Sequence, residues 1–152
     1  MSATSDIQAR REQIAVDYFR RVDAGDPAVT ELFTPDAVMF YPKFGYARGP
    51  AQIAAFARGL ARGIAELEHE IDGFTVLSSG DHVVVEGVER GTTTSGVTFP
   101  DGESTYGLFC NVFEFEGELV RRVHIYVDPD FAATHEDGVA WGRSVREDIA
   151  NL

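Results

Sequence analysis

The sequence has few of the features that mark secreted or membrane proteins. It has one cysteine, Cys110, so no intrachain disulfide can form and nothing indicates an oxidising compartment. The first residues, MSATSDIQARREQ, are polar and lack the apolar stretch of a signal peptide. No apolar run approaches the length that spans a bilayer. We therefore expect a cytoplasmic protein with no membrane partner, in which Cys110 is a small buried strand residue.

Basic residues are scarce. Lysine and arginine total 13 against 25 aspartate and glutamate residues, which gives a net charge of −12. A surface of this charge repels phosphate backbones and anionic lipids. We therefore expect neither a nucleic-acid partner nor binding to a membrane surface.

The usual motifs of metal and cofactor chemistry are missing. The four histidines lack paired ligand spacing and there is no cysteine pair, so no metal site is expected. No glycine-rich phosphate loop precedes a helix, and no GxSxG nucleophile motif occurs. Acid–base chemistry without a cofactor is the enzymatic chemistry that remains.

The periodicity of apolar residues divides the chain into helices followed by strands. Its 152 residues, 44% of them hydrophobic, are typical of a single globular domain, residues 1–152. Apolar positions at helical spacing predict helices over 5–24, 26–35 and 50–63, with a loop over 42–49. Alternating patterns and turn residues predict strands over 36–41, 66–77, 82–94, 104–115 and 119–127.

This order indicates an α+β fold. Segregated helices and strands are typical of that class, and a strongly curved antiparallel sheet wrapped around the N-terminal helices would form a cone. The core is expected over about residues 10–130. Residues 129–152 form a polar tail with Trp141 as its single large anchor, suited to cover a pocket mouth or a neighbouring subunit.

Four polar side chains are candidates to line one deep, mostly apolar pocket: Tyr18, Asp23, Tyr41 and His69. His69 lies between Leu67 and Ile71 on the apolar face of a predicted strand, where it is either a satisfied core residue or a base. Desolvation would keep its imidazole neutral near pH 7, and Asp23 is the carboxylate that would steer it. The alternative for Asp23 is a solvated position at the end of a helix.

The remaining polar candidates have two interpretations each. Tyr18 and Tyr41 are either core aromatics or donors to a carbonyl oxygen that gains charge during a reaction. Asn111 shares a strand face with several phenylalanines, so it is a structural link or a substrate contact. Glu89 is a second acid or a charge at the rim.

The other face of the predicted sheet is also apolar. Alternation places Leu108 and Cys110 on it, and it assigns His124 and Tyr126 to an outer or interface position. A sheet that is apolar on both faces needs a cover on both, and a homodimer partner is the simplest one.

Four segments resemble the SnoaL-like families of the nuclear-transport-factor-two-like superfamily: YFRRVDAGDPAVTELFTPDAVMFYP, ARGPAQIAAF, SSGDHVVVEG and NVFEFEGELVRRVHIYVD. The superfamily has a cone fold and contains ketosteroid isomerases, limonene epoxide hydrolases, polyketide cyclases, dehydratases and non-enzymatic members. The resemblance therefore implies the fold but not one reaction.

Individual positions favour some members over others. The general base of ketosteroid isomerase matches Tyr41, so steroid isomerisation of the usual kind is not expected. Of the three charged positions of limonene epoxide hydrolase, which match Gly87, Glu89 and Ile125, only Glu89 is charged. Bile-acid dehydratases and scytalone dehydratase match better, together covering Tyr18, Asp23, Tyr41, His69 and Asn111, although the second active-site histidine of scytalone dehydratase has no counterpart.

The resemblance thus implies a cofactor-independent dehydratase acting on a small, hydrophobic hydroxylated cyclic ketone, enone or polyketide-like substrate. The alternatives are an isomerase or polyketide cyclase using the same pocket, and a non-catalytic small-molecule-binding protein. The expected catalytic residues are His69, Asp23, Tyr41 and Tyr18. The expected substrate contacts are Asn111, Glu89, Met39, Phe109, Phe113 and Ile125.

Overall fold

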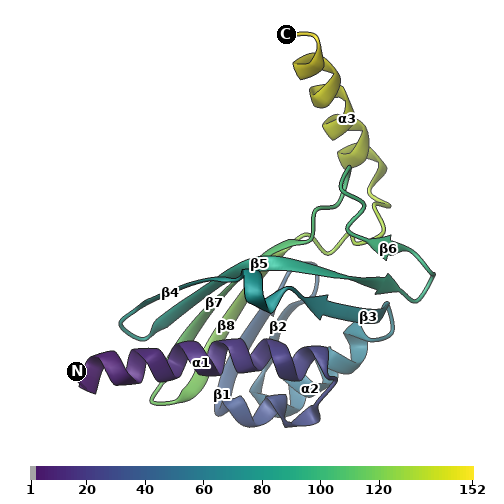
Figure 1. Ribbon diagram of the computed structural model, residues 1–152. Coiled ribbons are helices and arrows are strands. Elements are labelled where there is room, and N and C mark those ends of the chain that lie inside the picture. Colours follow the sequence, from purple (N-terminus) through teal and green to yellow (C-terminus); the bar gives the residue numbers. More distant parts are fainter. Residues whose placement is uncertain (1–2) are drawn as a thin grey trace.

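The computed structural model describes residues 3–152 and shows helices packed against one strongly curved sheet (Figure 1). The helices are α1 (Ala3–Asp23), α2 (Gly49–Leu60) and α3 (Glu136–Ala150), with short 3₁₀ segments η1 (Pro27–Leu32) and η2 (Ile71–Gly73). The strands are β1 (Phe33–Tyr41), β2 (Gly45–Arg48), β3 (Ile64–His69), β4 (Thr75–Ser79), β5 (His82–Thr93), β6 (Thr98–Phe99), β7 (Leu108–Glu116) and β8 (Leu119–Val127). The α+β fold class is confirmed.

The sheet is built around the long strand β5. The strand order is β2-β1-β8-β7-β5-β3, and β4 and β6 also pair with β5. Neighbouring strands are antiparallel except β1 and β8, which are parallel. The strands are therefore not a simple meander, because the last strand returns to lie between β1 and β7.

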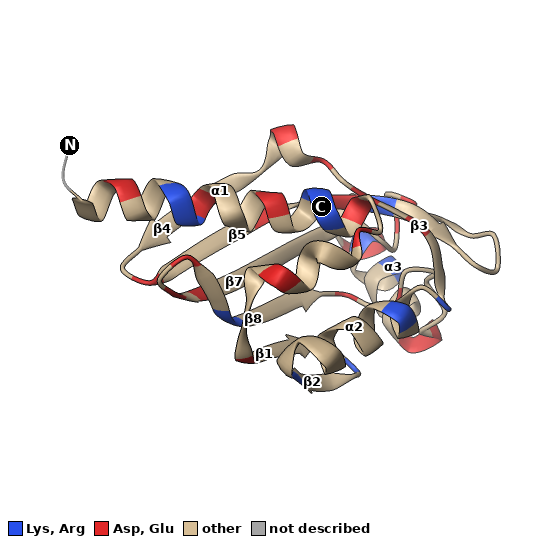
Figure 2. Ribbon diagram, turned by 90° about the horizontal axis from the view of Figure 1, so that it is seen from below, with Lys and Arg blue, Asp and Glu red and all other residues tan. Residues whose placement is uncertain are grey.

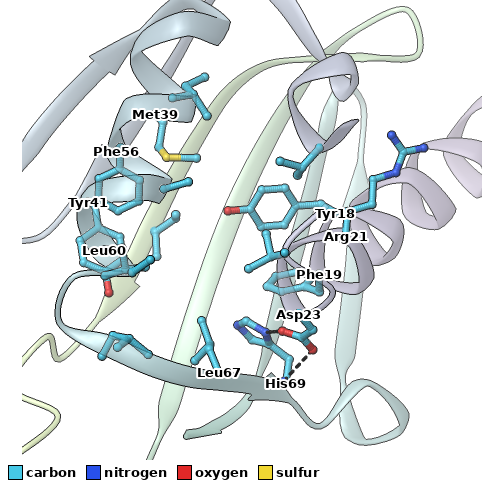
Figure 3. A pocket seen from close by; sticks show the side chains of 18 of the residues that line it. Tyr18, Phe19, Arg21, Asp23, Met39, Tyr41, Phe56, Leu60, Leu67 and His69 are labelled. Carbon is cyan, nitrogen blue, oxygen red and sulfur yellow. Dashed lines mark hydrogen bonds and ion pairs between the residues drawn. The ribbon is translucent and has the colours of Figure 1, made fainter. Parts of the chain in front are cut away.

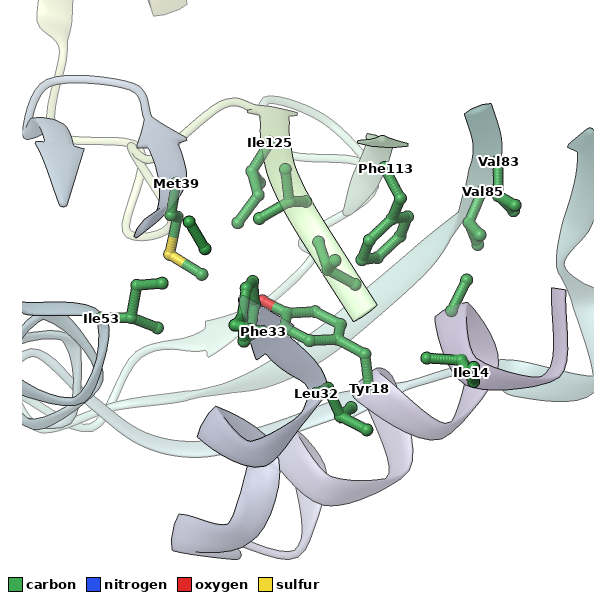
Figure 4. Packing of buried hydrophobic residues seen from close by; sticks show 14 of the residues in the cluster. Ile14, Tyr18, Leu32, Phe33, Met39, Ile53, Val83, Val85, Phe113 and Ile125 are labelled. Carbon is green, nitrogen blue, oxygen red and sulfur yellow. The ribbon is translucent and has the colours of Figure 1, made fainter. Parts of the chain in front are cut away.

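The core lies between α1 and the concave face of the sheet (Figure 4). Phe19 of α1 is 1% exposed, and it packs against Phe109 and Phe74 with ring centroids 5.2 and 4.9 Å away. Val83 and Val85 on β5 are fully buried beneath the helix. The predicted apolar stripe of residues 5–24 is thus the face that α1 presents to the sheet.

Two of the predicted boundaries are wrong in the first third of the chain. The second helix is 3₁₀ and ends at Leu32, and Thr34-Pro35 already belong to β1. The segment 42–49 is not only a loop, because Gly45–Arg48 form β2, which pairs antiparallel with β1. This segment is short and rich in glycine and aromatic residues, so it has no clear alternation that would predict an edge strand.

The predicted strand over 66–77 is two strands. The turn η2 separates β3 from β4, and the two pair with opposite halves of β5. Two further differences lie nearby: the short strand β6 forms between the predicted strands 82–94 and 104–115, and β7 begins at Leu108 instead of residue 104. The apolar positions change from Leu67 and Ile71 to Phe74 and Val76 across Asp72-Gly73, so the phase of the alternation slips where the two strands separate.

The C-terminal tail is a helix that stands away from the rest of the molecule (Figure 1). Trp141 is 70% exposed, so it does not anchor the tail to its own chain. Arg146 links α3 to the segment before β7 by donating to the carbonyl oxygen of Glu103 at 3.0 Å. The expectation that the tail covers the pocket mouth of this chain is wrong for α3.

A buried arginine fixes the N-terminal half of α1 to two turns of the sheet. Arg11 is 8% exposed and donates to the carbonyl oxygens of Gly117 (2.9 Å) and Gly80 (3.2 Å). It also forms an ion pair with Asp81 at 3.0 Å, and its guanidinium lies 5.8 Å from the centroid of the Phe115 ring. Figure 2 shows acidic residues spread over α1 and several turns.

We predict that Arg11→Ala lowers the free energy of unfolding by about 2 kcal/mol, because two carbonyl oxygens lose their donor. Arg10→Ala is the matched control, since Arg10 makes an exposed ion pair with Glu118 at 3.5 Å and should cost less than about 0.5 kcal/mol. Urea denaturation of the three proteins gives the comparison. Equal effects of the two substitutions would contradict the assigned role of Arg11.

Candidate active site

A cavity of about 560 Å³ lies between the helices and the concave face of the sheet (Figure 3). Its wall is mostly apolar, and its size is that of sites for small organic molecules. Exposed residues in the lining, such as Arg58, Ala61 and Ala65, mark its opening to solvent. Polar side chains reach the wall from α1, η1, β1, α2, β3, β5 and β7.

The end of α1 is joined to the end of β3 by two hydrogen bonds (Figure 3). Asp23 is the last residue of the helix, and its Oδ2 accepts from the backbone N–H of His69 at 2.9 Å. Its Oδ1 lies 2.5 Å from Nδ1 of the His69 ring. The predicted contact between these two residues is confirmed. A carboxylate at a helix C-terminus opposes the helix dipole, and these two hydrogen bonds offset that cost.

The other ring nitrogen of His69 faces a second carboxylate. The β3–β5 register places Glu89 opposite His69, with Oε2 3.2 Å from Nε2. Glu89 is 6% exposed and its Oε1 has no hydrogen-bond partner. Gly91 allows the backbones of β3 and β5 to approach this closely, since a Cβ at Gly91 would lie 1.9 Å from the carbonyl oxygen of Glu66. Of the two interpretations of Glu89, the rim charge is wrong.

The two carboxylates change the protonation state expected for His69. Burial alone lowers the pKa of the imidazole, but hydrogen bonds and charge interactions with Asp23 and Glu89 outweigh it and raise the pKa to about 9. The expectation of a neutral imidazole at pH 7 is therefore wrong, because it took account of the carboxyl group of Asp23 but not of that of Glu89. At neutral pH His69 is an imidazolium that lies between these two carboxyl groups.

Two phenols and one amide complete the polar part of the wall. Burial, and next the charge of Glu89, raise the pKa of Tyr18 and of Tyr41, so both remain protonated donors. Figure 3 shows the Tyr18 hydroxyl pointing across the cavity toward the side that carries Met39 and Phe56. Asn111 is 2% exposed and its Oδ1 has no hydrogen-bond partner, which leaves an acceptor in the wall.

The structure brings together most of the residues predicted for the site. The following predicted residues line the cavity: Tyr18, Asp23, Met39, Tyr41, His69, Glu89, Phe109, Asn111 and Ile125. Phe113 does not, because it is fully buried and its ring packs 5.4 Å from that of Tyr18. The structure therefore does not place Phe113 with the other expected substrate contacts in the lining of the cavity.

The sequence does not indicate the part of the wall that comes from α2 and from the segment after β8. Ile53, Phe56 and Leu60 line the cavity from α2, and Phe131 does so from the start of the tail. The apolar spacing in α2 was visible, but residues that face a cavity have the same spacing as residues that face a solid core. Nothing in the sequence near Phe131 indicates that the chain returns to the cavity there.

Neither a metal site nor a membrane span is found in the part of the chain that the structure describes. No group of three or more histidine, cysteine, aspartate or glutamate side chains within residues 3–152 is arranged to hold a metal ion. No helix in the same range has the length and apolar character needed to cross a bilayer.

A cone of helices on a curved sheet, with a cavity between them, defines the nuclear-transport-factor-two-like fold. The model of the SnoaL-like domain family matches residues 15–123, and the chain belongs to this family. A search of curated proteins found no match.

Solved structures have the same fold at low sequence identity. A candidate SnoaL-like polyketide cyclase from Jannaschia sp. CCS1 is similar with a TM-score of 0.71 and 18% identity, covering 88% of this chain and 99% of that one. A protein of unknown function with the same fold from Burkholderia pseudomallei has a TM-score of 0.68 and 22% identity over 78% of this chain and 91% of that one. A protein with a ketosteroid isomerase-like fold from Catenulispora acidiphila, in complex with trimethylamine, has a TM-score of 0.67 and 18% identity. The match covers 78% of this chain and 88% of that one.

The raised pKa of His69 predicts a pH-dependent part of the stability. Because the folded-state pKa of about 9 exceeds the ordinary value of 6.5, the stabilisation is complete below pH 6.5 and is lost as the pH rises through 9. The difference in unfolding free energy between the wild type and His69→Gln should therefore shrink by about 3 kcal/mol from pH 6 to pH 10. Urea denaturation at several pH values measures it, and a difference independent of pH would contradict the charged cluster.

Proposed function

We propose that the protein is a cofactor-independent dehydratase that eliminates water from a small hydroxylated cyclic ketone, enone or polyketide-like substrate. The observation that carries the proposal is a buried acid and a buried base side by side in the wall of an apolar cavity. His69, protonated near neutral pH, lies 3.2 Å from Glu89, and both line the cavity.

Glu89 is the better candidate for the base. Both ring nitrogens of His69 are engaged by carboxylates, whereas Oε1 of Glu89 has no partner. Oε1 is therefore the carboxylate oxygen at this position that is open to a proton from a substrate in the cavity. The imidazolium then serves as the acid, and Asp23 holds it in position through Nδ1.

The reaction proceeds in steps that balance its protons. Glu89 accepts the proton from the carbon next to the substrate carbonyl, and the hydroxyl of Tyr41 or Tyr18 donates a hydrogen bond to the enolate oxygen that forms. The enolate re-forms the carbonyl and a carbon–carbon double bond, and the β-hydroxyl leaves with the Nε2 proton of His69 as water. The proton on Glu89 then returns to Nε2 over the contact between them, which restores the starting state.

Related reactions would use the same groups. Isomerisation moves the abstracted proton to another carbon, and cyclisation directs the enolate to a second carbonyl; the Jannaschia protein named above as a candidate polyketide cyclase favours the second possibility. A binding protein without catalysis would need the cavity but no coupled acid and base. The contacts of His69 with Asp23 and Glu89 support the catalytic alternative.

A panel of cyclic β-hydroxy ketones tests the proposal. The wild-type protein should convert at least one of them to the enone, detected by its absorbance and by the loss of water in mass spectrometry. Glu89→Gln removes the base and should lower kcat/KM by about 10²–10⁴-fold. Glu86→Gln is the matched control, since Glu86 is exposed on the opposite face of the same strand and should leave kcat/KM unchanged.

Three results would contradict the proposal. A Glu89→Gln protein with wild-type kcat/KM would remove Glu89 from the base role. A product with the mass of the substrate would identify an isomerase or a cyclase instead. Tight binding of panel members without any conversion would identify a binding protein.

A further inference from the structure

The C-terminal helix α3 has an apolar face that its own chain leaves uncovered. Trp141, Val145 and Ile149, here called the helix stripe, are spaced four apart and are 70%, 36% and 61% exposed. The helix has 15 residues, of which Gly138 and Gly142 are poor helix formers. A helix of this length and composition is marginal in water without a surface to pack on.

A second apolar surface on the same chain is also uncovered. The convex face of the sheet carries Tyr46, Leu108 and Tyr126, which are 54%, 63% and 51% exposed. Phe40 joins the rings of this group, with centroids 5.3 Å from Tyr46 and 6.4 Å from Tyr126. These four residues, here called the outer patch, extend over β2, β1, β8 and β7, with their side chains on the same face according to the strand registers.

We propose that the helix stripe of one protomer docks on the outer patch of a second copy of this chain, in a reciprocal exchange. A twofold arrangement covers both surfaces of both copies at once. Arg146 ties α3 to Glu103, which holds the helix away from its own sheet (Figure 1). The helix stripe can therefore dock on the outer patch of a second copy but not on that of its own chain.

The dimensions of the two surfaces agree. A helix of 15 residues is about 22 Å long, and the strands β2, β1, β8 and β7 span three spacings, or about 14 Å. The helix is thus long enough to lie across the patch. Residues 128–135 connect β8 to α3, and α3 already projects away from the sheet of its own chain, where a second copy can meet it (Figure 1).

Some of the charges beside the two surfaces are complementary, while Glu86 adds a negative charge beside the outer patch, opposite Cys110. Asp137 precedes Trp141 by four residues and Asp148 follows Val145 by three, so carboxylates border the helix stripe. Arg48 borders the outer patch, with its guanidinium 5.5 Å from the Tyr46 ring, and among residues 3–152 it has no carboxylate partner within ion-pair distance. For a chain with a net charge of −12, such local attraction offsets the general repulsion between copies.

Trp141 is the only tryptophan of the sequence, so its fluorescence reports the docking directly. With increasing concentration of the full-length protein, its emission maximum should move to shorter wavelength as sedimentation velocity shows the mass doubling. A wild-type protein that stays monomeric, or that dimerises while Trp141 keeps the emission of an exposed tryptophan, would overturn the proposal.

Substitutions on the two surfaces separate the exchange from other dimers. Ile149→Glu on the stripe and Tyr126→Glu on the patch should each raise the dimer Kd by about 100-fold. Ala140→Glu is the matched control, because Ala140 is exposed on the opposite side of α3 and should leave the Kd unchanged. Circular dichroism checks that each variant is folded.

Mixing the Ile149→Glu and Tyr126→Glu proteins is the experiment that tests the reciprocal exchange most directly. The mixed dimer retains one intact helix–patch contact, so it should form at concentrations where each variant alone is monomeric. A mixture that stays monomeric would overturn the exchange. A normal Kd for Tyr126→Glu together with a weakened Ile149→Glu dimer would mean that α3 pairs with another α3, which also overturns it.

Discussion

The carboxylate of Asp23 is the group on which the arrangement of the site depends. One of its oxygens holds the backbone of His69 and the other holds the ring, so the end of α1, the end of β3 and the orientation of the imidazole are fixed together. Nearer the middle of the helix, Arg11 secures α1 to two turns of the sheet. The helix is therefore attached at its C-terminal end and near its middle, and the cavity between it and the sheet has a defined shape.

Burial makes this attachment chemically useful. Charged groups in an apolar wall are costly unless they are paired, and the imidazole of His69 between Asp23 and Glu89 is paired on both sides. The pairing keeps a proton on His69 at a pH where an isolated histidine would lose it. An acid and a base can therefore coexist at neighbouring positions, which is what elimination, isomerisation and cyclisation of carbonyl compounds all require.

Much of this can be predicted from the sequence, and the limits have physical reasons. The helix and strand order follows from periodicity, and the pairing of Asp23 with His69 follows from the family resemblance. The contact of Glu89 with His69 depends on the cross-strand register of β3 and β5, and the alternation within each strand does not give the register between two strands that η2 and β4 separate. The charge of His69 could not be predicted for the same reason, since it depends on that second acid. The position of α3 was also beyond prediction, because an amphipathic pattern does not say which surface will cover the helix.

The exchange of a carbon-bound proton with solvent is the step common to all the catalytic alternatives. It can be followed by nuclear magnetic resonance as the exchange of deuterium from heavy water into the position next to the carbonyl of a cyclic ketone. The account predicts that the wild-type protein accelerates this exchange and that Glu89→Gln does not. An exchange rate equal to that of buffer alone, for ketones that bind in the cavity, would contradict it.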